Sequence, residues 1–351
     1  MPKRLAVLIG TGAIAREHLT VLADMQDVEV AAVCDLSAAR AEATAERFGV
    51  KKWYTSHSAM LKDTSPDFVH ITTPPASHYD LAGRCLEMGL NVFCEKPITS
   101  SYEEFQTLRR LATDKGVLLI ENQNYRYHSS VQSIHKYVES GKLGEVIEVQ
   151  VQVFLDIHSP ESIFLDPNVA HYTSKLRGGV VGDFLTHICY LAQLFAGQVT
   201  SAGSVWYKLA SERSPRDDEF RAILKGEHSS AFVSFSGNAQ PNGFWLRVIG
   251  SNGQVEANLF EPPRLAFRRQ RGGAPPVASL VDGIGEALDI FKGSFGGLWR
   301  KLAGTGRYDG LGESIRKSYL ALNSRVPPVS LEEIDDTCRI IQLLTSDERR
   351  L

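Results

Sequence analysis

Three side chains in this sequence can move protons and stabilise charge: Lys96, Asp183 and His187. Lys96 stands in Glu95-Lys96-Pro97, directly after the apolar run at 91–94, and a lysine there can point its ammonium at a reacting oxygen. Asp183 and His187 are four residues apart, so on a helix they lie on one face. Histidine is the side chain best suited to transfer a proton at neutral pH. Together these residues predict proton transfer at a hydroxyl or carbonyl, although each alone has an ordinary explanation: an exposed lysine, a capping aspartate, a core histidine.

Glycines and polar residues precede the Asp183–His187 segment. Gly178 and Gly179 predict a backbone with room for a ligand. The preceding polar stretch either contacts substrate hydroxyls or is an ordinary solvated loop; it contains His158, His171, Tyr172, Lys175 and Arg177.

A glycine turn near the start of the chain predicts a phosphate-binding element. The apolar run at 5–9 opens directly into Gly10-Thr11-Gly12, and Ala15 supplies the small third position of G-x-G-x-x-A. Gly10 permits the tight turn, and Gly12 lets the backbone approach a pyrophosphate at the N-terminus of the following helix. The cofactor-binding residues predicted here are Gly10, Thr11, Gly12, Ala13 and Ile14.

The acidic residue after the second apolar run favours NAD. Residues 28–34 form a strand-like run that ends at Asp35, close to the spacing at which a carboxylate binds the adenosine ribose. A carboxylate suits two ribose hydroxyls and repels a 2′-phosphate, so NAD is favoured over NADP. Arg40, five residues on, softens that preference, and NADP stays an alternative.

Composition places the chain among ordinary globular proteins. It has 351 residues, 43% hydrophobic and 23% charged, with a formal net charge of -3. This length predicts two domains, and the charge gives no support to binding of nucleic acid or anionic membranes. No apolar stretch is long enough to span a bilayer, which predicts a cytoplasmic protein. The five cysteines lack C-x-x-C spacing and are expected to be reduced, buried small hydrophobic side chains.

Residues 1–122 are predicted to form one domain. Strand-like runs at 5–9, 28–34, 69–73, 91–94 and 117–120 alternate with helical patterns, and polar residues follow each run. Ser100-x-x-Glu103 is interpreted as a capping box for the helix at 101–115. Repeated strand–helix units predict a doubly wound parallel sheet, whose ligands bind beyond the carboxyl ends of the strands.

Residues 123–351 are predicted to form an α+β domain with an open, mostly antiparallel sheet. Residues 146–154 alternate apolar and polar side chains, which indicates a sheet with one wetter face. Further strands are predicted at 202–208, 219–225, 229–236, 244–249 and 254–259, and helices at 129–140, at 309–323 and after the box Ser330-x-x-Glu333.

An apolar stripe occupies the segment at 281–308. Its members recur at helical spacing although glycines interrupt it, so it either packs on its own domain or contacts a subunit or a membrane surface. They are Ile284, Leu288, Phe291, Phe295, Leu298 and Leu302.

Together these motifs resemble the Gfo/Idh/MocA family of oxidoreductases. The match covers most of the chain and includes Asp35, the segment Thr73-Pro74-Pro75-Ala-Ser-His78, Glu95-Lys96-Pro97, Asn122 to Arg126, and Asp183 with His187. The resemblance implies an N-terminal Rossmann domain, a C-terminal open sheet used for homo-oligomer formation, and oxidation or reduction of a sugar or cyclitol.

The resemblance also implies residue roles. Lys96 would orient the reacting oxygen, Asp183 would bind substrate, and His187 would be the acid or base; Arg126 joins the predicted substrate contacts. Thr73, Pro74, His78, Glu95 and Lys96 would contribute to the cofactor cleft. One departure is Leu185, where the family has glycine, which affects the substrate pocket. No metal site is predicted, because Asp183 and His187 lack a third ligand at a recognisable spacing.

The sequence therefore predicts an NAD-dependent oxidoreductase that acts on a polyhydroxylated carbon compound. Two alternatives stay open at this point: a dinucleotide-binding sensor without turnover, and glycoside cleavage by transient oxidation and elimination with the same residues.

Overall fold

The computed structural model describes residues 3–159, 162, 164, 172–176, 178–210, 217–261, 265–268 and 309–346. The chain forms two compact units: unit 1 contains residues 1–124 and 311–338, and unit 2 contains residues 125–310 and 339–351. The predicted division at 122/123 differs from these units, because residues 311–338 return to unit 1.

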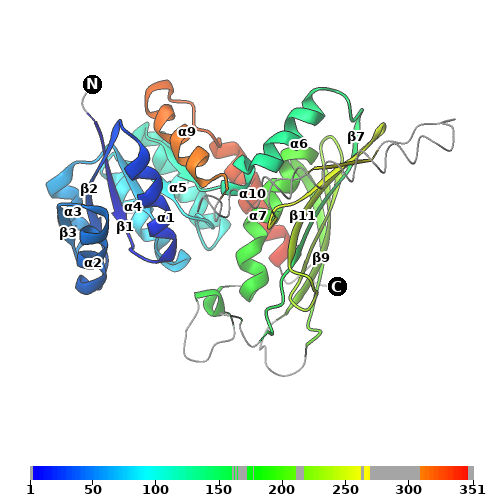
Figure 1. Ribbon diagram of the computed structural model, residues 1–351, viewed down its shortest axis with the longest axis horizontal. Helices are drawn as coiled ribbons and strands as arrows, with labels where there is room; N and C mark the ends of the chain where they lie inside the picture. The colour runs from blue at the N-terminus through cyan, green and yellow to red at the C-terminus, as the bar shows by residue number, and fades with distance from the viewer. Residues whose placement is uncertain are drawn as a thin grey trace. The chain divides into compact units, whose positions relative to one another are not determined.

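Unit 1 is built on a six-stranded parallel sheet of order β3-β2-β1-β4-β5-β6 (Figure 1). This confirms the predicted doubly wound sheet, although the short strand β3 was not predicted. The order steps outward from β1 in one direction and from β4 in the other, so the β1/β4 boundary is a topological switch point. The strands are β1 Arg4–Ile9, β2 Val28–Cys34, β3 Lys52–Tyr54, β4 Phe68–Ile71, β5 Asn91–Cys94 and β6 Leu119–Glu121.

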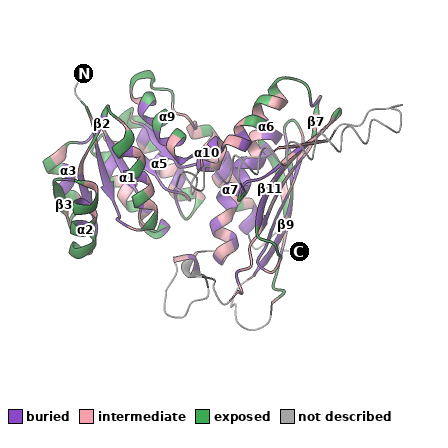
Figure 2. Cartoon of the chain, viewed as in Figure 1, coloured by how far each residue is buried: buried purple, intermediate pink, exposed green. Residues whose placement is uncertain are grey.

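Helices separate these strands, as parallel pairing requires. Most strand residues are buried (Figure 2), which explains their nearly continuous apolar sequences. The helical elements are α1 Ala13–Asp24, α2 Ala38–Phe48, α3 His57–Thr64, η1 Pro75–Ser77, α4 His78–Glu87 and α5 Tyr102–Lys115, followed by η2 Asn124–Tyr127.

Helix α9, Leu311–Ser324, belongs to unit 1 although it is far along the chain. Its Leu311, Ile315 and Tyr319 are buried in one apolar cluster with Phe68 of β4 and Phe93 of β5. Apolar burial against this sheet explains why a boundary drawn at 122/123 misplaces the helix: periodicity predicts a helix but not the sheet on which it packs.

The capping box of α5 lies one residue later than predicted. The Oγ atom of Ser101, not Ser100, accepts the backbone N–H of Glu104 at 3.2 Å. The carboxylate of Glu104 in turn accepts the N–H of Ser100 at 3.0 Å. The box at Ser330 and Glu333 is confirmed, because each side chain accepts the other residue's backbone N–H.

Unit 2 is built on a seven-stranded sheet of order β13-β12-β11-β7-β10-β9-β8. The neighbours pair antiparallel except for β7 and β10, which are parallel, so the predicted mostly antiparallel sheet is confirmed. Its strands are β7 Val146–Phe154, β8 Val199–Tyr207, β9 Glu219–Gly226, β10 Ser230–Ser236, β11 Gly243–Gly250, β12 Gly253–Asn258 and the unpredicted β13 Ala266–Arg268.

One face of this sheet is covered by helices. Side chains of α6 (Ser129–Glu139), α7 (Gly179–Ala196) and the end of α10 (Leu331–Thr345) share an apolar core with the strands. Among the described helices, α7 alone is long and apolar enough to cross a membrane, but 78% of it is buried inside the structure, as in a core helix. The remaining described helical element is η3, Tyr172–Lys175.

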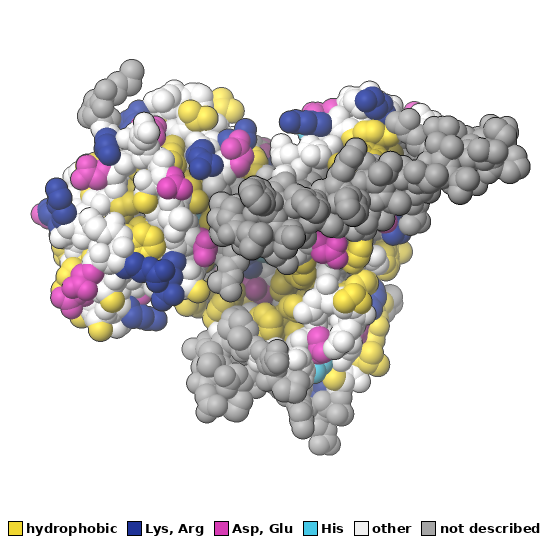
Figure 3. All heavy atoms as spheres, in the orientation of Figure 1, with side chains coloured by type: hydrophobic (Ala, Val, Ile, Leu, Met, Phe, Trp, Pro, Cys, Tyr) yellow, Lys and Arg dark blue, Asp and Glu magenta, His cyan; other side chains and the backbone are white. Residues whose placement is uncertain are grey.

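The other face of the sheet carries partly exposed apolar side chains. Ile223 is 64% exposed and pairs with Phe232, and Tyr207 is 40% exposed. Figure 3 shows one side of the molecule, on which acidic and basic side chains are intermixed, in keeping with the small net charge. The predicted stripe from Ile284 to Leu302 lies outside the described residues.

Candidate active site

The turn after β1 has the geometry that a dinucleotide-binding glycine turn needs. Gly10 has a φ of 93°, and a Cβ there would lie 2.7 Å from Cγ2 of Thr73, so only glycine fits. At Gly12, by contrast, no described heavy atom lies within 4 Å of the position that a Cβ would take. The backbone of Gly12 is therefore open to the approach of a ligand.

Helix α1 begins at this open position. Within the described residues no side chain caps it, and its first turn contains no acidic residue. The amide groups of a helix N-terminus and the helix dipole favour an anion there. Gly12, Ala13 and Ile14 thus fit the pyrophosphate of a dinucleotide.

Asp35 lies directly after β2 and is 8% exposed. Its Oδ2 accepts both the N–H and the hydroxyl of Thr11 at 2.9 Å, and its Oδ1 accepts the N–H of Ser37 at 2.9 Å. Nη2 of Arg40 donates to the same Oδ1 at 3.0 Å. Burial pushes the pKa of Asp35 upward, but these hydrogen bonds and the Arg40 charge outweigh it, so the pKa lies below its usual value. An ionised carboxylate fits the ribose hydroxyls of a dinucleotide.

His78 is fully buried and joins two loops at the carboxyl edge of the sheet. Its Nδ1 lies 2.8 Å from the carbonyl oxygen of Pro97, and its Nε2 lies 2.8 Å from that of Thr73. Burial lowers its pKa. The side chain would therefore hold the loops of a cofactor cleft from behind instead of lining the cleft, whereas Thr73 and Pro74 lie on the loop itself, where Ser77 Oγ donates to Thr73 Oγ1 at 2.8 Å.

Lys96 follows β5 and comes directly after Glu95, one of two buried carboxylates at this edge of the sheet, the other being Glu121. Oε1 of Glu95 lies 2.7 Å from both Nε2 of His18 and Nδ2 of Asn122. Burial opposes ionisation of Glu95, but the contacts with His18 and Asn122 and the Lys96 charge bring its pKa below the usual value. At Glu121 burial prevails, and the pKa is raised. The Lys96 charge acts to lower the pKa of both carboxylates.

Asp183 and His187 lie one turn apart on α7, as their spacing predicts, and both are largely buried. The Tyr172 hydroxyl donates to Oδ1 of Asp183 at 3.0 Å. Nδ1 of His187 lies 2.8 Å from the hydroxyl of Tyr190, which also accepts the N–H of Tyr125 at 3.1 Å. Because a tyrosine hydroxyl can donate or accept, Tyr190 can support the neutral and the protonated form of His187.

The structure also places three further residues that the sequence singled out: Gly178, Arg126 and Leu185. Gly178 has a φ of 77°, and a Cβ there would lie 3.0 Å from the ring of Trp206, so this glycine makes room for a side chain of its own unit. Arg126 lies in η2, where its carbonyl oxygen accepts Nε2 of Gln132 at 2.8 Å. Leu185 is fully buried in the core of unit 2.

The structure thus assembles the predicted residues in two sets. The glycine turn, Asp35, the Thr73 loop and Glu95-Lys96 all follow parallel strands of unit 1, at the edge where such sheets bind ligands. Asp183 and His187 belong to α7 of unit 2.

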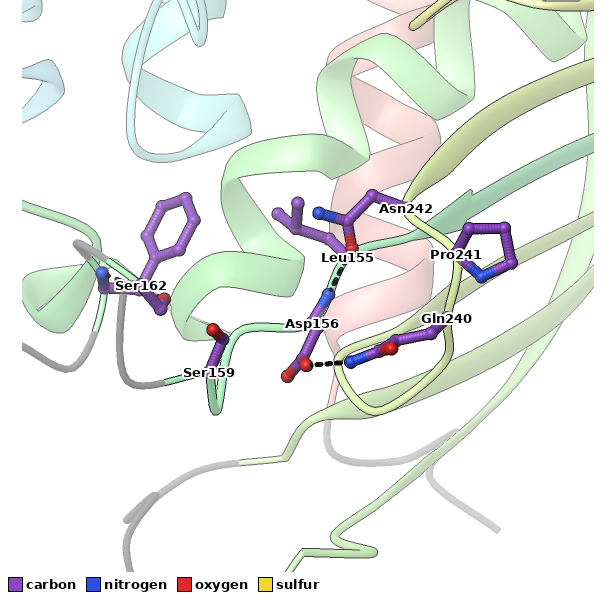
Figure 4. Close-up of a pocket in the computed structure, with 8 residues that line it drawn as sticks. Leu155, Asp156, Ser159, Ser162, Gln240, Pro241 and Asn242 are labelled. Atoms are coloured by element: carbon purple, nitrogen blue, oxygen red, sulfur yellow. Dashed lines mark hydrogen bonds between the residues drawn. The ribbon is translucent and has the colours of Figure 1, made fainter.

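A pocket of about 470 Å³ opens beside α7 in unit 2 (Figure 4). Leu155 and Phe164 in its wall pack against the same core as Val180 and Phe184 of α7. Its polar wall is held by Asp156, whose N–H donates to Oδ1 of Asn242 at 2.8 Å. The described lining residues include one carboxylate and no lysine or arginine; they are Leu155, Asp156, Ser159, Ser162, Phe164, Gln240, Pro241 and Asn242.

Several contacting residues were not predicted from the sequence. Tyr190 follows His187 by three residues, so helical spacing was a usable signal. No spacing in the sequence indicated that His18 contacts both Glu95 and His70, because the three residues come from separate elements. Among the described residues no group of three or more His, Cys, Asp or Glu could hold a metal ion.

Comparison with known families agrees with this architecture. Residues 4–123 match the model described as oxidoreductase family, NAD-binding Rossmann fold, and residues 131–256 match the GFO/IDH/MocA C-terminal domain. The chain belongs to the Gfo/Idh/MocA family. The predicted family, the enzyme class of NAD-dependent oxidoreductases and the dinucleotide cofactor are thereby confirmed.

Individual relatives act on carbohydrates. The chain is 31% identical over 297 residues to dTDP-3,4-didehydro-2,6-dideoxy-alpha-D-glucose 3-reductase from Saccharopolyspora spinosa, which covers 83% of this chain and 86% of that protein. It is 28% identical to D-xylose 1-dehydrogenase (NADP(+)) 2 from Haloferax volcanii, over 72% and 74% of the two chains. The WlbA dehydrogenase from Bordetella pertussis, solved with NADH and UDP-GlcNAcA, has the same fold, with a TM-score of 0.78, 18% identity and coverage of 98% and 94%.

Proposed function

We propose that this enzyme transfers a hydride between a nicotinamide dinucleotide and a carbinol carbon of a sugar, sugar derivative or cyclitol. The observation that carries the proposal is the Asp183–His187 pair on α7, with the imidazole of His187 held by Tyr190, in a chain whose family is defined by a dinucleotide-binding domain. Carbohydrate activity of the relatives supports the substrate class.

Each residue then has a role in oxidation of the alcohol. His187 accepts the hydroxyl proton, and the Lys96 ammonium stabilises negative charge that develops on the same oxygen. Asp183 binds a substrate hydroxyl, with Tyr172 holding its carboxylate in place, and Arg126 is a further substrate contact. When bound, the nicotinamide supplies the site that accepts or gives the hydride. The reverse reaction uses the same groups with His187 as the acid.

The predicted preference for NAD rests on Asp35. Its ionised carboxylate suits a ribose diol, and the Arg40 guanidinium beside it offers a partner for a 2′-phosphate. We infer that NAD is preferred and NADP is used less efficiently.

Asp183 and His187 are not among the residues that line the pocket beside α7, but if part of the substrate enters this pocket, its lining favours a neutral, hydroxyl-rich compound. Amide, hydroxyl and carboxylate groups of its described lining can exchange hydrogen bonds with sugar hydroxyls, and the carboxylate of Asp156 would repel a phosphate. We therefore expect sugars, glycosides or cyclitols to be preferred over nucleotide sugars.

Two further expectations concern the state of the protein in the cell. The apolar residues on the exposed face of the unit 2 sheet, such as Ile223 and Tyr207, support a homo-oligomer that buries this face. A cytoplasmic location is expected for an enzyme that uses a nicotinamide dinucleotide.

A panel of sugars, uronates, cyclitols and nucleotide sugars, followed by NADH absorbance, tests the proposal. Turnover with a neutral polyol supports it. Dinucleotide binding without turnover on any member indicates the sensor alternative, and product formation without net release of NADH indicates glycoside cleavage by transient oxidation.

A further inference from the structure

A buried chain of hydrogen-bonding side chains leads from Glu95 into the core of unit 1. Nε2 of His18 lies 2.7 Å from Oε1 of Glu95, and Nδ1 of His18 lies 3.1 Å from Nδ1 of His70. Nε2 of His70 lies 3.0 Å from the hydroxyl of Tyr319 on α9. Both imidazoles are fully buried and Tyr319 is 4% exposed. Both nitrogens of each ring are therefore in hydrogen bonds that water does not share.

The order of protons along this chain follows from the ionised carboxylate. A carboxylate only accepts, so a neutral His18 carries its proton on Nε2 and presents a lone pair at Nδ1. His70 must then donate through Nδ1–H, which leaves its Nε2 to accept the Tyr319 hydroxyl proton. Every bond points toward Glu95, and each one fixes the tautomer of the next ring.

We propose that His18, His70 and Tyr319 are positioning residues for hydride transfer: their one-directional hydrogen bonds hold Glu95 ionised beside Lys96. The proposal rests on the role of Lys96 in the proposed function. An ionised Glu95 sets a negative charge next to Lys96 in the sequence, and in the proposed function the Lys96 ammonium stabilises charge on the substrate oxygen. Asn122 completes the arrangement by donating Nδ2–H to the same Oε1 at 2.7 Å.

The titratable groups around this series of hydrogen-bonded side chains agree with this assignment. Burial holds the pKa of His70 far below its usual value, so this ring is neutral. Burial likewise raises the pKa of Tyr319, and nearby Asp67 and Asp27 add to that shift, so its hydroxyl keeps the proton. Around Glu95 the other charged or titratable groups are Lys96, Glu121, His78 and Cys94.

Protonation of Glu95 at Oε1 would reverse every hydrogen bond in this series of side chains. If Oε1 of Glu95 carries the proton and donates to Nε2 of His18, Nδ1–H of His18 donates to His70, and Nε2–H of His70 donates to Tyr319. The negative charge beside Lys96 is then cancelled. The chain therefore couples the charge of Glu95 to two buried tautomers, and activity should fall on the acid side as this proton is taken up.

NMR of protein labelled with ¹⁵N-histidine tests the proton order without any activity measurement. At pH 8 we expect His18 as the Nε2–H tautomer and His70 as the Nδ1–H tautomer, with resonances assigned through His18→Gln and His70→Asn. The opposite tautomers, or a doubly protonated His18 at this pH, would overturn the proposal. Because no substrate is needed, this result stands even if the proposed function fails.

Two substitutions at one position test the link to the reaction. His18→Gln keeps an N–H donor at the place of Nε2. His18→Met introduces a side chain of similar size that has no donor. We expect the acid limb of the kcat profile of His18→Met to lie about one pH unit or more above that of His18→Gln, because a carboxylate that loses a donor is more readily protonated. Identical acid limbs in the two variants would reduce His18 to a structural role and overturn the proposal.

Ser318→Ala is the matched control, because Ser318 is buried on the same helix as Tyr319. Its hydroxyl donates to the carbonyl oxygen of Ser314, which takes no part in the hydrogen bonds between Glu95 and Tyr319. We expect its acid limb to coincide with that of the unmodified enzyme. A shift as large as that of His18→Met would show that any change in the core moves the profile, and would overturn the proposal.

Discussion

Nη2 of Arg40 donates a hydrogen bond to Oδ1 of Asp35 at 3.0 Å, so the residue proposed to favour NAD is paired with a cation that we propose as a partner for the 2′-phosphate of NADP. Arg40 is the exposed partner, with 64% of its side chain accessible, whereas Asp35 is buried. A 2′-phosphate could therefore draw the guanidinium away from the carboxylate without unfolding the turn.

The first prediction concerns this pair. Arg40→Ala should weaken NADP binding about tenfold and change NAD binding less, because only the 2′-phosphate gains a charge-assisted hydrogen bond from Arg40. Isothermal titration of both dinucleotides measures the two dissociation constants. Tighter binding of NADP than of NAD by the unmodified protein would refute the role assigned to Asp35.

A second prediction is that Tyr190→Phe lowers kcat by about tenfold while the dissociation constant for NAD stays nearly constant. The hydroxyl of Tyr190 orients the imidazole of His187, and loss of one such hydrogen bond costs roughly 1 to 1.5 kcal/mol. Tyr137→Phe, on helix α6 of the same unit, is the control and should leave kcat unchanged. Equal kcat values for both variants would show that His187 does not depend on this contact.

Stability should fall as the pH drops below about 6.5, the ordinary histidine pKa. His70 and His78 have lowered pKa values in the folded state because both are buried. At a pH above the unfolded-state pKa, both histidines are neutral in the folded and the unfolded state and do not change the free energy of unfolding. At a lower pH the unfolded chain binds protons that the folded protein does not bind, so folding becomes less favourable.

Urea unfolding at pH 8, 6 and 5 measures this effect. The variant His70→Asn should lose stability at pH 8 but show a weaker dependence on pH. His228→Asn is the control, because the side chain of His228 is 69% exposed. A pH dependence that His70→Asn leaves unchanged would assign the acid sensitivity to other groups.

The exposed sheet face gives a further prediction. If the proposed homo-oligomer buries this face, Ile223→Asp should reduce the mass measured by light scattering, because burial of an unpaired charge in a subunit contact is costly. Ile147→Asp is a matched control: Ile147 is 55% exposed but falls in register with the residues of β7 that face the helices. An unchanged mass for Ile223→Asp would remove this face from the oligomer contact.

Local patterns predicted much of the fold and part of the site. Four-residue spacing was enough to place Asp183 and His187 on one helix face, since α-helical geometry fixes that relation. The glycine turn and Asp35 were predictable for a similar reason, because strand, turn and helix follow one another in sequence.

Contacts between distant segments were not predictable in this way. His18 and His70 are separated by 52 residues, and Tyr319 by a further 249, so no local period relates them. Helix α9 was predicted as a helix, but its return to unit 1 depends on the complementary apolar surface beside Phe68 and Phe93. The shift of the α5 cap from Ser100 to Ser101 reflects adjacent serines that both satisfy the pattern.

Turnover by His187→Asn and Lys96→Met, with NAD affinity measured alongside, tests the central claim most directly. Asn keeps polarity but cannot transfer a proton, so kcat of His187→Asn should fall by about two to four orders of magnitude while NAD binding barely changes. Lys96→Met should also lower kcat, and the double variant should lose less than the product of the two single losses, because in the proposed function both residues act on one oxygen in one transition state. Full turnover by both single variants on the true substrate would contradict the assignment of the active site.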